Sequence, residues 1–329
     1  MLISVVIPLY NKKKSILRTV SCVLQQTYKD FEIILVDDGS TDGSLECLES
    51  ITDPRLKRYR KKNTGVSDTR NKGMEWASGE VIAFLDGDDL WDPFYLERLH
   101  DMVASYPDCG LYMQDSIDIP AQEANQAKGS EEHKEIKKFN NWEHYFYYRN
   151  FKTSALAVNK AKAMELQGFD QSLTIGEDLD FWFRLILSYP VCFLDEIHVF
   201  ILKYEEEYHS RFVPKDFSKH FSYKLVFKKN LYLNLKDNKD VHFIMNKIIF
   251  YALLGFDKDK NTEAVRILSK NLSFGRLNWK DKIGKDFSYW VKLTTGYSDN
   301  KIKEAGFQAS PGFDNIVRGE RSDRGVWGY

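Results

Sequence analysis

Apolar and polar positions in the first 106 residues follow two alternating patterns. Continuous apolar runs predict buried strands over 2–7, 31–36, 56–59 and 81–85. Apolar residues at helical spacing predict helices over 15–26, 66–76 and 94–106, with a shorter helix near 45–51. Ser15 is the expected N-cap of the first helix, and Pro8 is expected to end the first strand because it cannot donate to a ladder. Strands alternating with helices predict βαβ units and a largely parallel sheet.

Polar residues follow three of these strands at the point where each ends. The segments are Pro8-Leu9-Tyr10, Asp37-Asp38-Gly39-Ser40 and Asp86-Gly87-Asp88-Asp89. In open α/β sheets ligands bind beyond the carboxyl ends of the strands, at a topological switch point. We therefore expect the three segments to face one crevice.

The last of these segments places three aspartates within four positions, directly after a buried strand. Asp86 and Asp88, with Gly87 allowing close backbone approach, would form the hard oxygen site that Mg²⁺ or Mn²⁺ prefers. The alternative is a polar turn leading into a helix N-cap. The shared edge of the sheet favours the metal site over the turn.

Single residues at the same edge suggest a nucleotide, although each also has a plainer interpretation. Tyr10 could stack on a base or be a surface tyrosine, and Asp37 and Asp38 could accept hydrogen bonds from a nucleoside or only shape a turn. Arg70 could meet a phosphate or be a solvated helix residue. No GxGxxG or GxxxxGK[ST] motif occurs, so a phosphate-bearing nucleotide would have to be held through a metal.

The second half of the chain carries fewer motifs. Residues 121–138 predict a polar surface loop, and aromatic residues cluster over 142–148. Glu177 and Asp178 open an apolar helix, where carboxylates either favour the helix terminus or supply a general base. Aromatic and basic helical patterns follow residue 215, and residues from 304 onward have the composition of a flexible tail.

Length and composition limit the remaining alternatives. The 329 residues suit one large α/β domain with an attachment, or two domains, and a net charge of −1 does not indicate a nucleic-acid partner. Four scattered cysteines indicate reduced core residues of a cytoplasmic protein. We expect neither a transmembrane helix nor a signal peptide, since the chain enters a strand pattern at once.

Six motifs in order resemble the family 2 glycosyltransferases. They are SVVIPLYN at 4–11, LQQTY at 24–28, VDDGSTD at 36–42, GVSDTRNKG at 65–73, FLDGDD at 84–89 and GEDLDFW at 176–182. Any one of them is weak, but six at sensible spacing are highly specific, and together they cover roughly the first 210 residues. The family's enzymes are inverting, and the resemblance implies a GT-A fold: an α/β, Rossmann-like, mostly parallel sheet flanked by helices, here with a mainly helical C-terminal region.

The resemblance implies a role for each matching residue. Those that would bind the nucleotide donor are Pro8, Tyr10, Asp37, Asp38, Arg70 and Asp86. Asp86 and Asp88 would form the family's DxD motif, and the ligands of Mn²⁺ or Mg²⁺ would be Asp88, with Asp86, Asp89 and His209 as further candidates. The residues leave open whether Asp86 or Asp89 only supports the site. The general base would be Asp178, with Glu177 as the alternative.

The expected function is transfer of a sugar from a nucleotide-diphospho-sugar, most simply a UDP-sugar, to a saccharide or lipid-linked acceptor in surface polysaccharide synthesis. A sugar-1-phosphate nucleotidyltransferase is the alternative enzyme, but its Gly-rich N-terminal segment is absent between Pro8 and Ile16. A non-catalytic nucleotide-sugar-binding module is the third, disfavoured by the intact acidic residues.

The expected domains are a catalytic domain over 1–215, divided into a nucleotide-binding half (1–115) and an acceptor half (116–215), a helical region over 216–303, and a tail over 304–329. Aromatic and lysine-rich helices over 221–256 leave open peripheral contact with the inner face of the membrane, or self-association.

Overall fold

The computed structural model describes residues 1–139, 152–204, 216–227 and 261–271. The chain divides into two compact units, residues 1–221 and residues 222–329. In the second unit the described residues are largely helical, in α6 (Phe221–Phe227) and α8 (Thr262–Asn271). The boundary at 215 stays a prediction, and the aromatic cluster at 142–148 and the tail lie outside the described residues.

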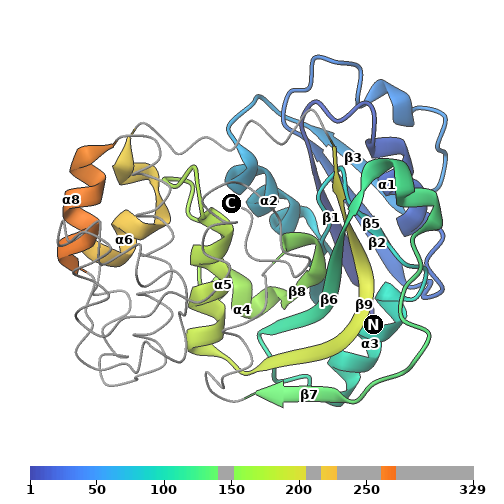
Figure 1. The fold of residues 1–329 in the computed structure, drawn as a ribbon. Coiled ribbons are helices and arrows are strands. Elements are labelled where there is room, and N and C mark those ends of the chain that lie inside the picture. The colour runs from blue at the N-terminus through green and yellow to red at the C-terminus, as the bar shows by residue number, and fades with distance from the viewer. Residues whose placement is uncertain (140–151, 205–215, 228–260, 272–329) are drawn as a thin grey trace, which may run out of the picture. The chain divides into compact units, whose positions relative to one another are not determined.

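The first unit is built on a nine-stranded sheet in the order β3-β2-β1-β4-β8-β6-β9-β5, with β7 paired to β9 (Figure 1). The strands are β1 (Ile3–Leu9), β2 (Phe31–Asp37), β3 (Leu56–Arg60), β4 (Val81–Phe84), β5 (Leu90–Trp91), β6 (Leu111–Pro120), β7 (Ile136–Phe139), β8 (Leu156–Asn159) and β9 (Val191–Lys203). Six of these strands run in the same direction: β1, β2, β3, β4, β6 and β9. The predicted mostly parallel sheet is therefore confirmed for this unit as far as it is described.

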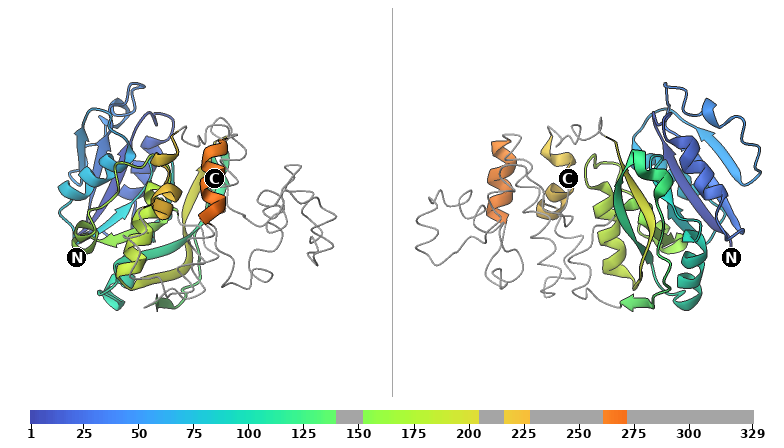
Figure 2. Two further views of the ribbon diagram at one scale, coloured as in Figure 1. Left: turned by 90° about the vertical axis from the view of Figure 1, so that its left-hand side faces the viewer. Right: turned by 45° about the vertical axis from the view of Figure 1, so that its right-hand side comes forward.

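Helices cover both faces of this sheet (Figures 1 and 2). They are α1 (Ile16–Leu24), α2 (Val66–Trp76), α3 (Tyr95–Ser105), α4 (Lys160–Glu165) and α5 (Glu177–Ser188), with 3₁₀ turns at η1 (Glu46–Leu48), η2 (Ala121–Gln126), η4 (Thr153–Ala155) and η6 (Phe217–Lys219). On one face Ile7 shares a buried cluster with Val20 of α1 and Leu99 of α3. This is the amphipathic packing that the helical spacing predicts.

On the other face α2 and α5 lie against the alternate side chains of the strands. Gly73 of α2 comes so close to β1 that a Cβ there would lie 2.3 Å from Val6 Cγ1. Trp182 of α5 meets Phe84 of β4 edge to face, with ring centroids 5.6 Å apart. These contacts hold both helices against β1 and β4, the strands that the first and third polar segments follow.

The sequence predicts that the first strand ends at Pro8, but β1 continues to Leu9. The carbonyl of Val6 accepts from Leu85 on the β4 side, and that of Leu9 accepts from Asp38 on the β2 side. Because the sides alternate along a strand, the nitrogen of Pro8 faces β4, which has already ended at Phe84. No ladder donor is required there, and the proline is tolerated.

The polar segment 121–138 is more ordered than the predicted surface loop, because β9 offers it a partner. It contains η2, and β7 pairs antiparallel with β9 over Val191–Leu194. Farther along β9, Ser130 exchanges hydrogen bonds with Ile197, donating its N–H to the carbonyl and accepting the N–H at its hydroxyl. Composition alone therefore misjudged a segment whose order comes from pairing with a distant strand.

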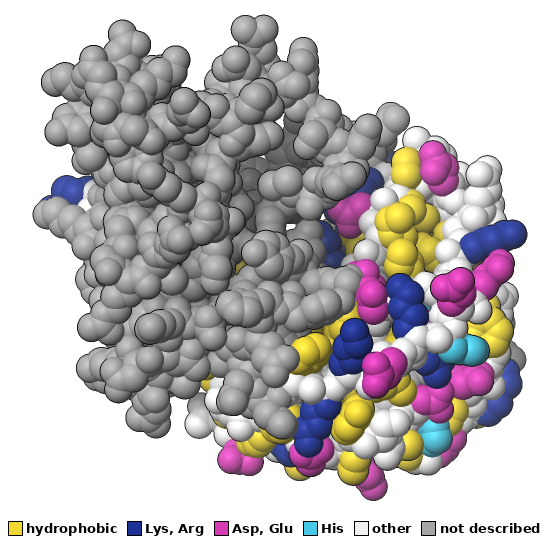
Figure 3. Space-filling model, turned by 60° about the horizontal axis from the view of Figure 1, so that its bottom comes forward, with side chains coloured by type: hydrophobic (Ala, Val, Ile, Leu, Met, Phe, Trp, Pro, Cys, Tyr) yellow, Lys and Arg dark blue, Asp and Glu magenta, His cyan; other side chains and the backbone are white. Residues whose placement is uncertain are grey.

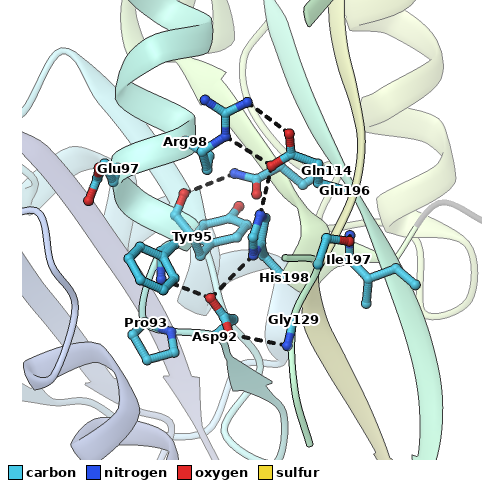
Figure 4. Close-up of polar contacts among 12 residues, drawn as sticks. Asp92, Pro93, Tyr95, Glu97, Arg98, Gln114, Gly129, Glu196, Ile197 and His198 are labelled. Atoms are coloured by element: carbon cyan, nitrogen blue, oxygen red, sulfur yellow. Dashed lines mark hydrogen bonds and ion pairs between the residues drawn. The ribbon is translucent and has the colours of Figure 1, made fainter. Parts of the chain in front are cut away.

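A buried polar network lies beside this segment and joins α3 to β9 (Figure 4). His198, 2% exposed, contacts Asp92 Oδ1 at 3.2 Å through Nδ1 and Glu196 Oε2 at 2.9 Å through Nε2. Arg98 donates to both oxygens of Glu196, at 2.9 and 2.8 Å. Burial alone would lower the pKa of His198, but its two carboxylate partners outweigh burial and raise it above the ordinary value.

On the face drawn in Figure 3, basic and acidic side chains of the described residues are interspersed. The cysteines agree in part with the expected core positions. Cys109 and Cys192 are buried, whereas Cys22 and Cys47 are half-buried, and all four are free thiols. Among the described residues no helix has the length and apolar character needed to cross a bilayer.

Candidate active site

The loops that follow β1, β2 and β4 are bonded to one another, as the sequence predicts. The N–H of Asn11 donates to Ser40 Oγ at 3.0 Å, and Asn11 Oδ1 accepts from the N–H of Thr41 at 2.9 Å. Ser15 occupies the N-cap position of α1, but its hydroxyl makes no cap bond and donates instead to the carbonyl of Gly87 at 2.8 Å. The predicted N-cap position is therefore confirmed, but the Ser15 side chain fastens the acidic turn to α1 instead of capping the helix.

Two carboxylates of this acidic turn, residues 86–89, are neutralised by cations of the chain itself. Arg70 Nη2 donates to Asp86 Oδ1 at 2.8 Å. Lys12 Nζ forms an ion pair with Asp88 Oδ2. A strand end so rich in negative charge thus meets positive charge from α2 and from the loop after β1.

Asp89, the third carboxylate, faces the interior. Its Oδ2 accepts from Ser154 Oγ at 2.5 Å and its Oδ1 from the N–H of Leu202 at 3.2 Å. Burial, together with the charges of Asp88 and Asp86, raises its pKa well above the ordinary value. Asp89 therefore ties the acidic turn to η4 and β9.

Arg70 joins the acidic turn to the start of α5. Its side chain is 6% exposed, and its Nη1 lies 3.3 Å from Glu177 Oε1 while Nη2 holds Asp86. The guanidinium also stands over the ring of Phe169, 5.4 Å from its centroid. One buried cation thus brings together two segments that are 91 residues apart in the sequence, from position 86 to position 177.

The carboxylates of Glu177 and Asp178 lie in the first turn of α5, which starts after Gly176. Gly176 has a φ of +74°, and a Cβ there would meet Phe221 Cβ at 2.9 Å, so this helix start requires glycine. Burial raises the pKa of Glu177 to about 7, with the charge of Asp178 adding to the rise and Arg70 opposing it. Burial likewise raises the pKa of Asp178, and Arg70 opposes it.

Residues predicted to hold the nucleobase lie at the ends of β1 and β2. Tyr10 is 49% exposed, so its ring is open to a ligand, and Pro8 is half-buried. Asp37 is fully buried, accepts the N–H of Ser40 at 2.9 Å and forms an ion pair with Arg60 Nε at 3.2 Å. Its position inside the turn makes it a support of the loop after β2.

Asp38 orders the loop that precedes α2. Its two oxygens accept the N–H groups of Thr64 and Gly65, at 2.9 and 3.0 Å, and Lys61 Nζ pairs with it as well. Gly65 has a φ of +96°, a conformation that favours glycine. Asp38 therefore positions the N-terminus of α2, the helix that carries Arg70.

The acidic turn could bind a divalent cation, but it offers very few protein ligands. Among the described residues, no group of three or more His, Cys, Asp and Glu side chains could by itself hold a metal. Asp88, with a side chain 19% exposed, and Asp86, 33% exposed, are the accessible carboxylates of the acidic turn. Mg²⁺ commonly binds through one or two carboxylates, water and substrate phosphates, a donor set that these two could begin. His209 lies outside the described residues.

The side chains of the site that are absent from the sequence-based expectations include Lys12, Ser154 and Lys61. Each bonds an aspartate that is between 23 and 76 positions away. A lysine in a lysine-rich loop and a serine before a strand carry no local signal of these partners. Only the register of the sheet, which aligns the strand ends, brings them together.

Comparison with known proteins identifies the first half of the chain. The model of "Glycosyl transferase family 2" matches residues 4–163. A putative teichuronic acid biosynthesis glycosyltransferase of Bacillus subtilis, TuaG, is 42% identical over 100 residues, which are 30% of this chain and 40% of TuaG. For several other curated glycosyltransferases the chain covers between 13% and 35% of the protein's length.

Solved structures extend the similarity over most of the chain at low identity. S. aureus TarS in complex with UDP-GlcNAc has a TM-score of 0.60 and 19% identity, over 89% of this chain and 82% of that one. A mannosyltransferase of Pyrobaculum calidifontis in complex with GDP-Man and Mn²⁺ has a TM-score of 0.50 and 16% identity, over 90% and 88%. Identities this low establish the fold alone. Residues 4–163 match glycosyl transferase family 2, and the chain has the GT-A fold.

Proposed function

We propose that this protein is an inverting glycosyltransferase that moves a sugar from a nucleotide-diphospho-sugar to an acceptor hydroxyl. The observation that carries the proposal is the bridge made by Arg70, which joins Asp86 of the acidic turn to Glu177 of α5. A glycosyltransferase needs a site for the donor's diphosphate next to a carboxylate that can accept a proton. The bridge brings residues suited to both tasks into one site.

A UDP-sugar is the proposed donor, and the loops after β1 and β2 are its proposed base site. The exposed ring of Tyr10 can stack on uracil, and Pro8 lies two residues before it. Asp38 shapes the neighbouring loop and would lie at the nucleoside, and the buried Asp37 would support that loop from within. The UDP-GlcNAc bound by TarS supports this choice of nucleotide.

A divalent cation, Mn²⁺ or Mg²⁺, is the proposed cofactor. Asp88 would hold it together with Asp86, and the Mn²⁺ present in the Pyrobaculum mannosyltransferase supports a metal in this fold. When bound, such an ion neutralises negative charge on the departing diphosphate. Asp89 would support the turn rather than ligate, because both of its oxygens accept hydrogen bonds within the chain.

Asp178 is the proposed general base, and Glu177 is the alternative. Arg70 contacts Glu177 at 3.3 Å, whereas Asp178 Oδ1 accepts the N–H of Leu179 at 2.7 Å and its Oδ2 lies 3.5 Å from Thr153 Oγ1. The acceptor oxygen would attack the anomeric carbon from the face opposite the nucleotide, forming the new C–O bond as the bond to the diphosphate breaks. The hydroxyl proton passes to Asp178, whose raised pKa suits it to accept one.

The proposed acceptor is a hydroxyl of a saccharide or of a lipid-linked oligosaccharide. The assignment of TuaG to teichuronic acid biosynthesis supports a role in surface polysaccharide synthesis. Residues 116–215 would supply the acceptor side and residues 1–115 the donor side. Contact of the C-terminal helices with a membrane or a second copy belongs to the same proposal.

The test is UDP release from a panel of UDP-sugars, with and without Mn²⁺, on the wild type and on Asp178→Asn. We expect release that needs the metal and falls by roughly 10²–10⁴-fold in Asp178→Asn, the usual contribution of a general base. Glu177→Gln is the matched control at the neighbouring position, with a smaller loss. Metal-independent release that Asp178→Asn leaves unchanged would contradict the proposed mechanism.

A further inference from the structure

Lys12 places a positive charge on the carboxylate to which the proposed function assigns the metal. Its ammonium forms an ion pair with Asp88 Oδ2, and the two side chains are 29% and 19% exposed. The pair is thus partly screened from solvent but still reachable by ligands. A divalent cation that binds Asp88 has to displace this ammonium or share the carboxylate with it.

The backbone around Lys12 is fixed, so the lysine is held near the acidic turn. The N–H of Lys12 donates to Ser44 Oγ at 2.8 Å, and its carbonyl accepts from the N–H groups of Ser15 and Ile16 at 3.0 and 2.9 Å. Only the side chain beyond this anchored backbone has to move when its ammonium changes partner. A flexible four-carbon stem with a compact charge suits such an exchange.

Hydrogen bonds also attach the acidic turn to the residues that follow Lys12. The hydroxyls of Ser15 and Thr19 donate to the carbonyl of Gly87 at 2.8 and 3.2 Å, and Thr19 also donates to the carbonyl of Asp89 at 3.0 Å. A Cβ at Gly87 would lie 3.6 Å from Lys12 Cγ, so the lysine stem runs directly along the turn. The contact between Lys12 and Asp88 is therefore built into the connection between α1 and the strand end.

Lys12 and Arg70 differ in how easily each cation can leave its carboxylate partner. Arg70 is buried and divided between Asp86 and Glu177, so its guanidinium cannot leave without exposing two carboxylates to each other. The Lys12 side chain is 29% exposed, against 6% for Arg70, and it pairs with Asp88 of the acidic turn. Of these two cations, Lys12 is the one that can be exchanged.

We propose that Lys12 is an exchangeable counter-ion of the donor site. Its ammonium neutralises Asp88 when no metal is bound, and it turns to the donor's diphosphate when a divalent cation takes that carboxylate. This inference rests on the proposed function, because it assigns the acidic turn to the metal and the diphosphate. It makes Lys12 a positioning residue that couples metal binding to donor binding: each ligand improves the site for the other.

Calorimetric titration of the full chain with Mn²⁺ alone tests the competition without measuring activity. We expect Lys12→Met to bind Mn²⁺ about fivefold more tightly than the wild type, the upper range for loss of one partly exposed ion pair. Lys12→Arg keeps the charge and should stay near the wild type. Lys13→Met is the matched control, because Lys13 is exposed and its stem lies beside Gly43, with Nζ 3.4 Å from the position of a Cβ there.

Two further measurements separate competition at Asp88 from a change in folding. In an Asp88→Asn background, Lys12→Met should no longer change the Mn²⁺ affinity, because the shared carboxylate is gone. With Mn²⁺ present, Lys12→Met should weaken UDP binding several-fold, since the ammonium is missing from the diphosphate; this is opposite in sign to its effect on Mn²⁺ alone. A general structural defect would weaken both.

An affinity of Lys12→Met for Mn²⁺ that is equal to or weaker than that of the wild type overturns the inference. The same holds if Lys13→Met shows the same gain. A wild-type protein that binds UDP neither with nor without Mn²⁺ instead refutes the proposed function itself. The two failures are therefore distinguishable.

Discussion

Arg70 offers the sharpest test of how the site is held together. The variant Arg70→Met keeps an apolar side chain of similar length but removes the guanidinium that lies between Asp86 and Glu177 and over the ring of Phe169. Both carboxylates then remain beside one another without their shared cation. Because Arg70 is only 6% exposed, solvent does little to replace the lost interaction.

Removing one member of a buried ion pair typically costs about 3–5 kcal/mol. Asp86 is one-third exposed and water will partly solvate it, which places the expected loss of unfolding free energy for Arg70→Met at about 3 kcal/mol. Glu177 limits the loss further, because its pKa of about 7 lets it take up a proton when Arg70 is absent. Stability lost at pH 8 should therefore recover in part at pH 5.5.

Urea denaturation of the full chain, followed by hydrogen-exchange mass spectrometry of peptides that contain β4 and α2, measures this loss in the first unit. Arg55→Met is the matched control: Arg55 donates to Asp53 in a pair whose side chains are 28% and 25% exposed, and its removal should cost less than about 1 kcal/mol. The double variant Asp86→Asn with Glu177→Gln should tolerate Arg70→Met better than the wild type does. Equal losses for Arg70→Met and Arg55→Met would refute the bridge as the link between the two halves of the site.

Three further changes test other parts of the structure. Gly73→Ala should lower the unfolding free energy by about 1–3 kcal/mol in urea, because its Cβ would meet Val6 Cγ1 at 2.3 Å; an unchanged midpoint would contradict the close packing of α2 on β1. His198→Gln should flatten the pH dependence of stability above pH 6.5. Because the folded pKa of His198 is raised, its contribution to stability is complete below its unfolded pKa and is lost as the pH rises through the folded pKa. Equal slopes for the variant and the wild type in thermal melts from pH 6 to 8.5 would refute the charged role of His198. Tyr10→Ala should weaken UDP binding roughly tenfold, within the range of base stacking, and leave stability unchanged because the ring is 49% exposed; an unaltered UDP affinity would remove Tyr10 from the base site.

The strands and helices of the first half could be predicted because each is specified locally. The apolar spacing over 66–76 predicts a helix that coincides with α2, and the run over 31–36 predicts β2 to within one residue. Pro8 and the segment 121–138 were misjudged for a shared reason. Whether a proline or a polar segment joins a sheet depends on which neighbouring strand has ended or lies open, and that information is absent from the local sequence.

The site could be predicted only at the level of its segments. Sequence placed Asp38, Asp86 and Glu177 at strand or helix ends, where carboxylates signal either a turn or a function. It could not show that Arg70 links Asp86 to Glu177, or that Lys12 meets Asp88, because these partners are 16 to 107 positions apart. Such pairings depend on how strands align, so they appear only in the folded chain.

A crystal structure of the full chain with UDP and Mn²⁺ tests the central claim most directly. The account predicts the uracil ring against Tyr10, and the metal held by a carboxylate oxygen of Asp88 beside the diphosphate. It also predicts that Lys12 has left Asp88, and that Asp178 faces the open side of the diphosphate. UDP bound away from the ends of β1, β2 and β4, or a diphosphate with no contact to the acidic turn, would contradict it.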